Sequence, residues 1–186
     1  ENLQELLQSQ EAWLDGEIKE LLRKRALVRR HSERLYAAKS ITVGKVYEEQ
    51  WEKATLLLSE ATRTWEEQGR HAAVEKAIAA HLRYVLSHDV YAGFGFGAMV
   101  ERADYMTSGQ EGLICRYFTP TALPLRRLPK EFRHERPAGR YLVTYFAGDY
   151  MKTAPAYALL RAYLAEHALT PVGCSYEESL IDEIAA

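Results

Sequence analysis

The sequence predicts an α+β fold in which a long helix precedes a domain built from a duplicated β-α-β-β unit. Three observations lead to this prediction. Apolar residues recur at seven-residue spacing near the N-terminus, residues 91–100 alternate as a strand does, and residues 136–183 read as strand, helix and strand. We therefore expect a helix over 1–38 and a domain over 39–186, whose two halves form one antiparallel sheet with a ligand cleft between them.

The composition is that of a soluble globular protein, with 47% hydrophobic and 27% charged residues in a chain of 186. A formal net charge of -2 argues against a surface dedicated to nucleic acid. No apolar run approaches the roughly 20 residues that span a bilayer, and no signal peptide opens the chain, so we expect a cytoplasmic protein. Cys115 and Cys174 are expected to be reduced and structural. Because the first residue is not Met, we expect a fragment of a longer protein.

Residues 1–36 favour one long helix that dimerises as a short, imperfect coiled coil. The apolar seam consists of Leu7, Leu14, Ile18, Leu21 and Val28, with Leu3 and Leu35 adding to it. Acidic residues crowd the first half of the helix and basic residues the second half, so an antiparallel pair sets unlike charges against each other. We therefore predict an antiparallel homodimer. The alternatives are an amphipathic helix packed on its own domain and a cationic segment that touches nucleic acid.

The first half of the domain is expected to contain strands and a helix. Residues 41–47 read as a strand, 54–60 as a second extended piece, and 64–88 as a helix. In 91–100, Phe94, Phe96 and Ala98 alternate with a row of glycines. Glycine in a strand indicates that something approaches the backbone closely, and we expect a helix or a ligand there.

The second half of the domain begins after a further strand. Residues 111–119 form that strand, which we expect Pro120 to close, and 120–136 form an Arg-rich connection. A strand over 139–147 and a helix with Pro155 in its first turn follow. In the last strand, 176–182, alternation sends two carboxylates to opposite faces of the sheet.

Four motifs carry a resemblance to a known family: YAGFGF at 91–96, RYFTP at 116–120, P-x-G-R-Y at 137–141 and VGCSYEE at 172–178. In this order and spacing, over 70–182, the chain resembles the C-terminal part of MerR-family transcription regulators, specifically the GyrI-like effector-binding domain of their multidrug-sensing members. The resemblance implies a bacterial regulator fragment that forms a homodimer through its coiled coil. It also implies a small-molecule effector, hydrophobic and cationic or aromatic, with no cofactor, no membrane contact and no catalysis.

The resemblance also implies which residues bind the effector. In that family a buried glutamate faces the positive charge of the drug, and the matching residue is Glu177, after Tyr176. A family aromatic contact falls on Tyr91. At two positions where those regulators have aromatic side chains, this chain has Gly148 and Thr153. We take the nearby rings of Phe146 and Tyr150 as substitutes. The candidate ligand-binding residues are Glu177, Tyr91, Phe146, Tyr150, Ser179 and Gly95.

Other readings of these residues stay open. Glu177 could instead form an ion pair with Arg116 or Arg140 and merely hold the sheet together. A stand-alone GyrI-like hydrolase or binding protein could use Glu177 as general base, helped by Tyr91 or Tyr145. A protein-binding cleft is a third reading. The scattered histidines and the two cysteines predict no metal site.

Two departures from the family pattern concern the ends of the chain. No DNA-binding head precedes residue 1, so we do not expect this segment to bind an operator by itself; DNA would be bound only through such an N-terminal head. The closing C-terminal strand of the family is also absent before Ala186.

Overall fold

The structure, a computed structural model, describes residues 2–62, 70–88, 90, 96–107, 114–149 and 152–179. The helices are α1 (Leu3–Lys39), α2 (Arg70–Ser87), α3 (Arg102–Met106) and α4 (Ala154–Glu166), with a 3-10 turn, η2 (Leu125–Arg127). The strands are β1 (Val46–Trp51), β2 (Ala54–Leu58), β3 (Gly97–Val100), β4 (Ile114–Thr121), β5 (Arg133–Arg136), β6 (Gly139–Thr144) and β7 (Ser175–Glu178). The predicted α+β class with a long N-terminal helix is confirmed.

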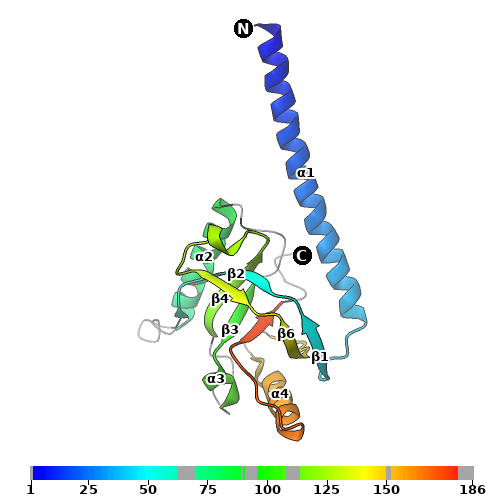
Figure 1. The fold of residues 1–186 in the computed structure, drawn as a ribbon, viewed down its shortest axis with the longest axis vertical. Helices are drawn as coiled ribbons and strands as arrows, with labels where there is room; N and C mark the ends of the chain where they lie inside the picture. The colour runs from blue at the N-terminus through cyan, green and yellow to red at the C-terminus, as the bar shows by residue number, and fades with distance from the viewer. Residues whose placement is uncertain are drawn as a thin grey trace.

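Helix α1 projects away from the rest of the molecule, and only its C-terminal end lies near the sheets (Figure 1). It has no proline, and its length is supported by pairs one turn apart, such as Arg29 with Glu33 at 2.9 Å. Its apolar seam faces solvent: Leu7 is 60% exposed, Leu14 51% and Leu21 61%. The helix therefore gains no stability from burying this seam within its own chain.

The strands form two antiparallel sheets rather than the single sheet that we predicted. One contains β1 and β6, and the other has the order β5-β2-β4-β3-β7. The two sheets are nearly continuous. The last pair of one, Trp51 with Gly139, and the first pair of the other, Ala54 with Arg136, are separated by two residues on each chain segment. Pro137 lies in the gap between β5 and β6, and proline has no N–H to donate to the ladder. The pairing is interrupted there and the chain bends.

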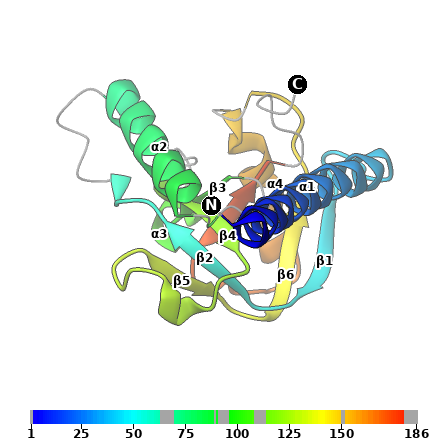
Figure 2. The same ribbon diagram turned by 90° about the horizontal axis from the view of Figure 1, so that it is seen from above.

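Helices α2 and α4, both labelled in Figure 2, send side chains to the same face of the five-stranded sheet. On this face His81 of α2 hydrogen-bonds to Thr119 of β4 at 2.9 Å, while Tyr157 of α4 reaches β7. Burial lowers the pKa of His81 to about 4, so its imidazole is neutral. We call this the helix face of the sheet.

The opposite face carries an apolar core of its own. Leu56, Leu58, Met99, Cys115 and Phe118 are buried together there, with Tyr176 packed against them. Both cysteines are free thiols, as predicted. We call this the inner face, because β5 and β7, the two edges of the sheet, are linked across it by side chains described below.

Three element predictions need correction. Pro120 does not close its strand, because β4 continues to Thr121. In the described residues β3 begins opposite Phe118, so Pro120 has a ladder partner only on the β2 side. The N–H that proline lacks is therefore not needed for pairing with β3, and its loss costs little. The Arg-rich connection contains strand β5, and the first strand begins at Val46 rather than at 41. Residues 64–69, 91–95, 111–113 and 180–182 of the predicted elements lie outside the described residues.

Candidate functional site

Glu177 lies on the helix face of β7, directly opposite the first turn of α4. Its carboxylate accepts a hydrogen bond of 2.5 Å from the Tyr157 hydroxyl and a longer one of 3.4 Å from Thr153 Oγ1. The Tyr157 hydroxyl also lies 2.9 Å from Ser175 Oγ. Glu178, the next residue, points to the inner face and pairs with Arg136 at 2.8 Å. The prediction that two carboxylates of this strand face opposite ways is therefore confirmed.

The start of α4 explains why Thr153 and Tyr157 meet Glu177. Thr153 is the N-cap residue and Pro155 occupies the first turn, where its missing N–H is not needed. Tyr157 follows Thr153 by four residues, about one helical turn, so both side chains point the same way. The partial positive charge at a helix N-terminus also favours a carboxylate placed there.

The electrostatics of Glu177 are dominated by burial. Loss of hydration raises the pKa of its carboxyl, and the hydrogen bonds from Tyr157 and Thr153 offset only part of that shift. Burial and the nearby Glu177 charge in turn raise the pKa of Tyr157, so its hydroxyl stays protonated and donates. Ionising the Glu177 carboxyl therefore costs more free energy than ionising an exposed carboxyl.

The arginines proposed as partners of Glu177 are engaged elsewhere. Arg116 donates to the carbonyl oxygen of Ser59 at 2.7 Å, and Arg140 lies 3.6 Å from Glu48. Among the described residues, no lysine or arginine forms an ion pair with Glu177. The reading of Glu177 as a structural ion pair with Arg116 or Arg140 is therefore wrong.

The glycine row does not leave room for a ligand at Gly97. A Cβ added there would collide with the Phe118 ring and with the Glu177 carbonyl oxygen, at 2.7 Å. The close neighbour is thus a core side chain, where we expected a helix or a ligand. Register also separates the glycine from the carboxylate, because Gly97 pairs with Glu178 and Ala98 with Glu177. Glu177 shares the helix face with Ala98.

An aromatic pair lies on the same face as Glu177. Ala98 pairs with Tyr117 on one side and with Glu177 on the other, so these three residues form one row across β4, β3 and β7. The Phe96 ring stacks on Tyr117, with centroids 4.9 Å apart and planes 15° apart. The small Ala98 side chain separates this aromatic pair from the carboxylate and its tyrosine.

The other predicted site residues are only partly placed. Phe146 lies beyond the end of β6, 37% exposed, with its ring against Gly148. Ser179 follows β7 and is exposed. Tyr91, Gly95 and Tyr150 lie outside the described residues. The hydrogen bonds to the Glu177 carboxylate come instead from Tyr157 and Thr153.

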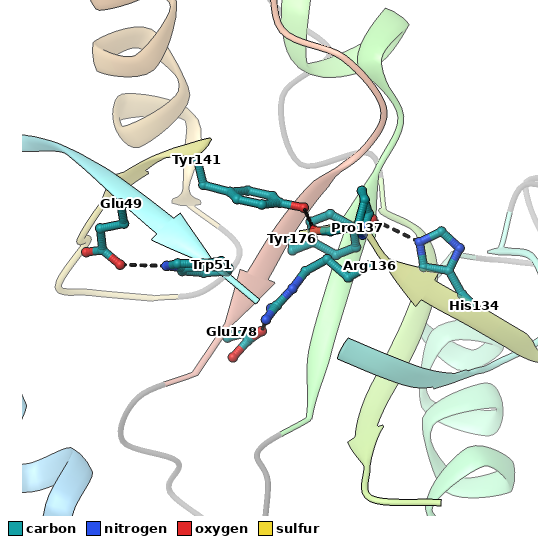
Figure 3. Close-up of polar contacts among 8 residues, drawn as sticks. All are labelled: Glu49, Trp51, His134, Arg136, Pro137, Tyr141, Tyr176 and Glu178. Carbon is teal, nitrogen blue, oxygen red and sulfur yellow. Dashed lines mark hydrogen bonds and ion pairs between the residues drawn. The ribbon is translucent and has the colours of Figure 1, made fainter. Parts of the chain in front are cut away.

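A second polar cluster, on the inner face, was not predicted (Figure 3). The Arg136 guanidinium lies 4.4 Å from the Trp51 ring and 6.0 Å from the Tyr176 ring, and it pairs with Glu178. Trp51 stacks on Tyr141 with centroids 5.1 Å apart. An open depression of about 390 Å³ adjoins the cluster, lined by Gln50, Trp51, Glu52, Lys53, Arg136 and Glu178.

The side chains that contact Glu177 on the helix face, and those that contact Arg136 on the inner face, were not predicted. Tyr157 stands at an apolar position of the helical period, but a tyrosine hydroxyl one turn into a helix can also reach a neighbouring strand. One part of the inner cluster could be predicted from the sequence. Tyr176 and Glu178 alternate with Glu177 along the strand, so both lie on the face opposite to Glu177. Nothing in the local sequence pairs them with Arg136, which is 42 residues before Glu178.

Within the described part of the chain, no helix is long and apolar enough to cross a bilayer, and no group of three or more metal-ligating side chains comes together. Neither the protein-family models nor the curated proteins compared with the chain match it.

Proposed function

We propose that this chain is the effector-binding and dimerisation part of a MerR-type bacterial transcription regulator, and that it senses a hydrophobic cation at Glu177. The family resemblance supplies the class of protein. One observation carries the choice of site: Glu177 is a largely desolvated carboxylate whose described partners are two neutral hydroxyl groups. Such a group lacks a counter-charge, and a cationic ligand would supply it.

The neighbours of Glu177 suit an aromatic or hydrophobic cation. The stacked Phe96 and Tyr117 rings share its face, two strands away, with only Ala98 between. A cation over an aromatic face gains roughly 0.5–2 kcal/mol, more when it is desolvated. The combination of one carboxylate with aromatic side chains on the same face favours ligands that carry a positive charge within an apolar body.

Titration calorimetry tests this proposal with tetraphenylphosphonium, a hydrophobic cation, and the neutral triphenylphosphine oxide. We expect micromolar binding of the cation, much weaker binding of the neutral compound, and at least about tenfold loss of cation affinity in Glu177→Gln, since a lost buried charge contact is worth more than 1.4 kcal/mol. Glu178→Gln, on the opposite face of the same strand, is the matched control. Equal binding of both compounds, or cation binding unaffected by Glu177→Gln, would refute the role of Glu177.

A hydrolase is the second candidate, favoured by the hydrogen bond between Glu177 and Tyr157. A carboxyl with a raised pKa beside a protonated tyrosine is an arrangement suited to general acid-base chemistry. A binding domain leaves its ligand unchanged, whereas a hydrolase turns it over and loses turnover in Glu177→Gln. Product analysis after long incubation separates the two.

A further inference from the structure

The two edges of the five-stranded sheet are joined by side chains. Strands β5 and β7 lie at opposite ends of the order β5-β2-β4-β3-β7. Yet His134 Nε2 of β5 lies 2.9 Å from the Tyr176 hydroxyl of β7, and Arg136 Nη1 of β5 donates to Glu178 of β7 at 2.8 Å. The sheet is therefore curved enough for its edges to meet across the inner face (Figure 3).

Arg136 makes the broader of these two links, since it also contacts β1. Its guanidinium covers the Trp51 ring of β1 at 4.4 Å, and its side chain is only 14% exposed. The Nε atom is buried and has no hydrogen-bond partner among the described residues. A buried N–H without a partner destabilises this arrangement, so an arrangement in which Nε finds a partner can compete with it.

Strand β7 connects this cluster to the proposed effector site. Glu177 and Glu178 are consecutive residues on opposite faces of the strand, with Tyr157 contacting the first and Arg136 the second. One carboxylate cannot shift along or across the strand without moving the other. Strand β1, which carries Trp51, begins seven residues after the end of α1 at Lys39.

We propose that Arg136 is a positioning residue that couples effector binding at Glu177 to β1 and hence to the base of helix α1. In one arrangement, the one seen here, the guanidinium pairs with Glu178 and covers Trp51. In the other it leaves Glu178, and Trp51 is uncovered. A cation bound at Glu177 displaces β7 and shifts the population between the two. This inference rests on the proposed function.

Fluorescence of Trp51 reports the state of Arg136 directly. Replacing the other two tryptophans, as Trp13→Phe and Trp65→Phe, leaves Trp51 as the single emitter. We expect tetraphenylphosphonium to change Trp51 emission in this background, with a midpoint that matches the calorimetric dissociation constant. In Arg136→Met we expect the emission change to fall at least fivefold. Cation affinity should stay within about threefold, because Arg136 lies on the opposite face from Glu177 and linkage limits the affinity change to the coupling free energy.

Further variants separate coupling from folding. Arg136→Lys keeps the charge but not the planar fork, and we expect it to restore less than half of the response. Glu178→Gln removes the ion pair and leaves the stacking on Trp51, so it should also reduce the response even if Arg136→Met does not fold. Arg133→Met, a matched arginine on the same strand, should leave the response intact.

The outcomes distinguish the two proposals. Cation binding that Glu177→Gln abolishes, without any change of Trp51 emission, overturns the coupling and leaves the proposed function standing. A full change of Trp51 emission in both Arg136→Met and Glu178→Gln also overturns the coupling. So does a loss of cation affinity in these variants that is as large as the loss of the emission change. Absence of cation binding to the intact protein overturns both proposals.

Discussion

At the scale of single residues, Glu177 should weaken the folded state at neutral pH. Its pKa is raised above the ordinary value of 4.5, so the folded protein holds this proton more tightly than the unfolded chain does. The resulting stabilisation is present at low pH and is lost as the pH rises from 4.5 through the raised pKa. A carboxylate kept in place at such a cost is more easily explained by ligand binding than by stability.

Glu177→Gln should therefore raise the free energy of unfolding at neutral pH. The amide still accepts the Tyr157 hydrogen bond but carries no charge to desolvate. The difference in the free energy of unfolding between Glu177→Gln and the unchanged protein should be smallest below pH 4.5. It should grow with pH and level off above the raised pKa of Glu177. Urea titrations across this pH range measure it. Glu178→Gln should instead destabilise at neutral pH, because it breaks the pair with Arg136. A Glu177→Gln gain that is the same at every pH would contradict the account.

Tyr157→Phe should destabilise the fold and raise the pKa of Glu177 further. The hydroxyl serves both Glu177 and Ser175, so its removal leaves two partners short of a hydrogen bond. We expect a loss of about 1–3 kcal/mol in thermal or urea unfolding. Tyr141→Phe, which loses only a bond to the Pro137 carbonyl, is the control and should cost less. Equal losses in the two variants would argue against the shared role of the Tyr157 hydroxyl.

At the scale of strands and helices, Gly97 marks where β3 is crossed by the Phe118 ring. Gly97→Ala should destabilise by about 1–3 kcal/mol, because the added methyl group meets that ring and the Glu177 carbonyl oxygen. In Gly16→Ala, by contrast, the methyl group meets nothing within 4 Å, and the exposed helix α1 should gain roughly 0.5–1 kcal/mol. Unfolding curves of both variants check the pair. A neutral Gly97→Ala would mean that the Phe118 ring is not fixed against β3.

The elements with a clear period were predictable from the sequence. Helix α4 has Pro155 in its first turn, as predicted, and strand β6, rich in β-branched and aromatic residues, lies within the predicted range 139–147. The opposite orientation of Glu177 and Glu178 also follows from the two-residue period of a strand. Local pattern therefore predicts α4, β6 and the opposite orientation of Glu177 and Glu178.

The elements without such a period could not be predicted. Strand β5 has the sequence RHER, which lacks β propensity, and it forms only because β2 supplies its ladder partners. The division into two sheets depends on the bend near Pro137. The partners of Glu177 and Arg136 depend on tertiary contacts between residues 20 and 42 positions apart. Sequence periodicity carries no information about such contacts.

At the scale of the whole molecule, the apolar seam of α1 is exposed along the helix. Ile18 is 54% exposed and Val28 69%, in line with the other seam residues. An antiparallel second copy would bury the seam and match its acidic half with its basic half, and this homodimer stays our prediction. Leu14→Glu with Leu21→Glu should give a monomer in sedimentation analysis. Leu6→Glu, outside the heptad positions, should leave the dimer intact.

The direction of the pair is measurable with one spin label at Gln8. If the antiparallel helices cross near Leu21, the two labels lie about 40 Å apart at 1.5 Å of rise per residue. A parallel pair would place them within roughly 10–15 Å, a helix separation plus the labels. Double electron-electron resonance distinguishes the two distances, and the short one would contradict the charge argument.

Whether Glu177 recognises the positive charge of an effector can be tested by counting the protons released when a cation binds. Because a cation favours the ionised carboxylate and the free carboxyl has a raised pKa, binding should release a fraction of one proton. Calorimetry of tetraphenylphosphonium binding in buffers of different ionisation enthalpy gives this number. The account predicts a release that grows as the pH is lowered from neutrality toward that pKa and that vanishes in Glu177→Gln. Tight binding with no proton release at any pH, or with the same release in Glu177→Gln, would contradict it.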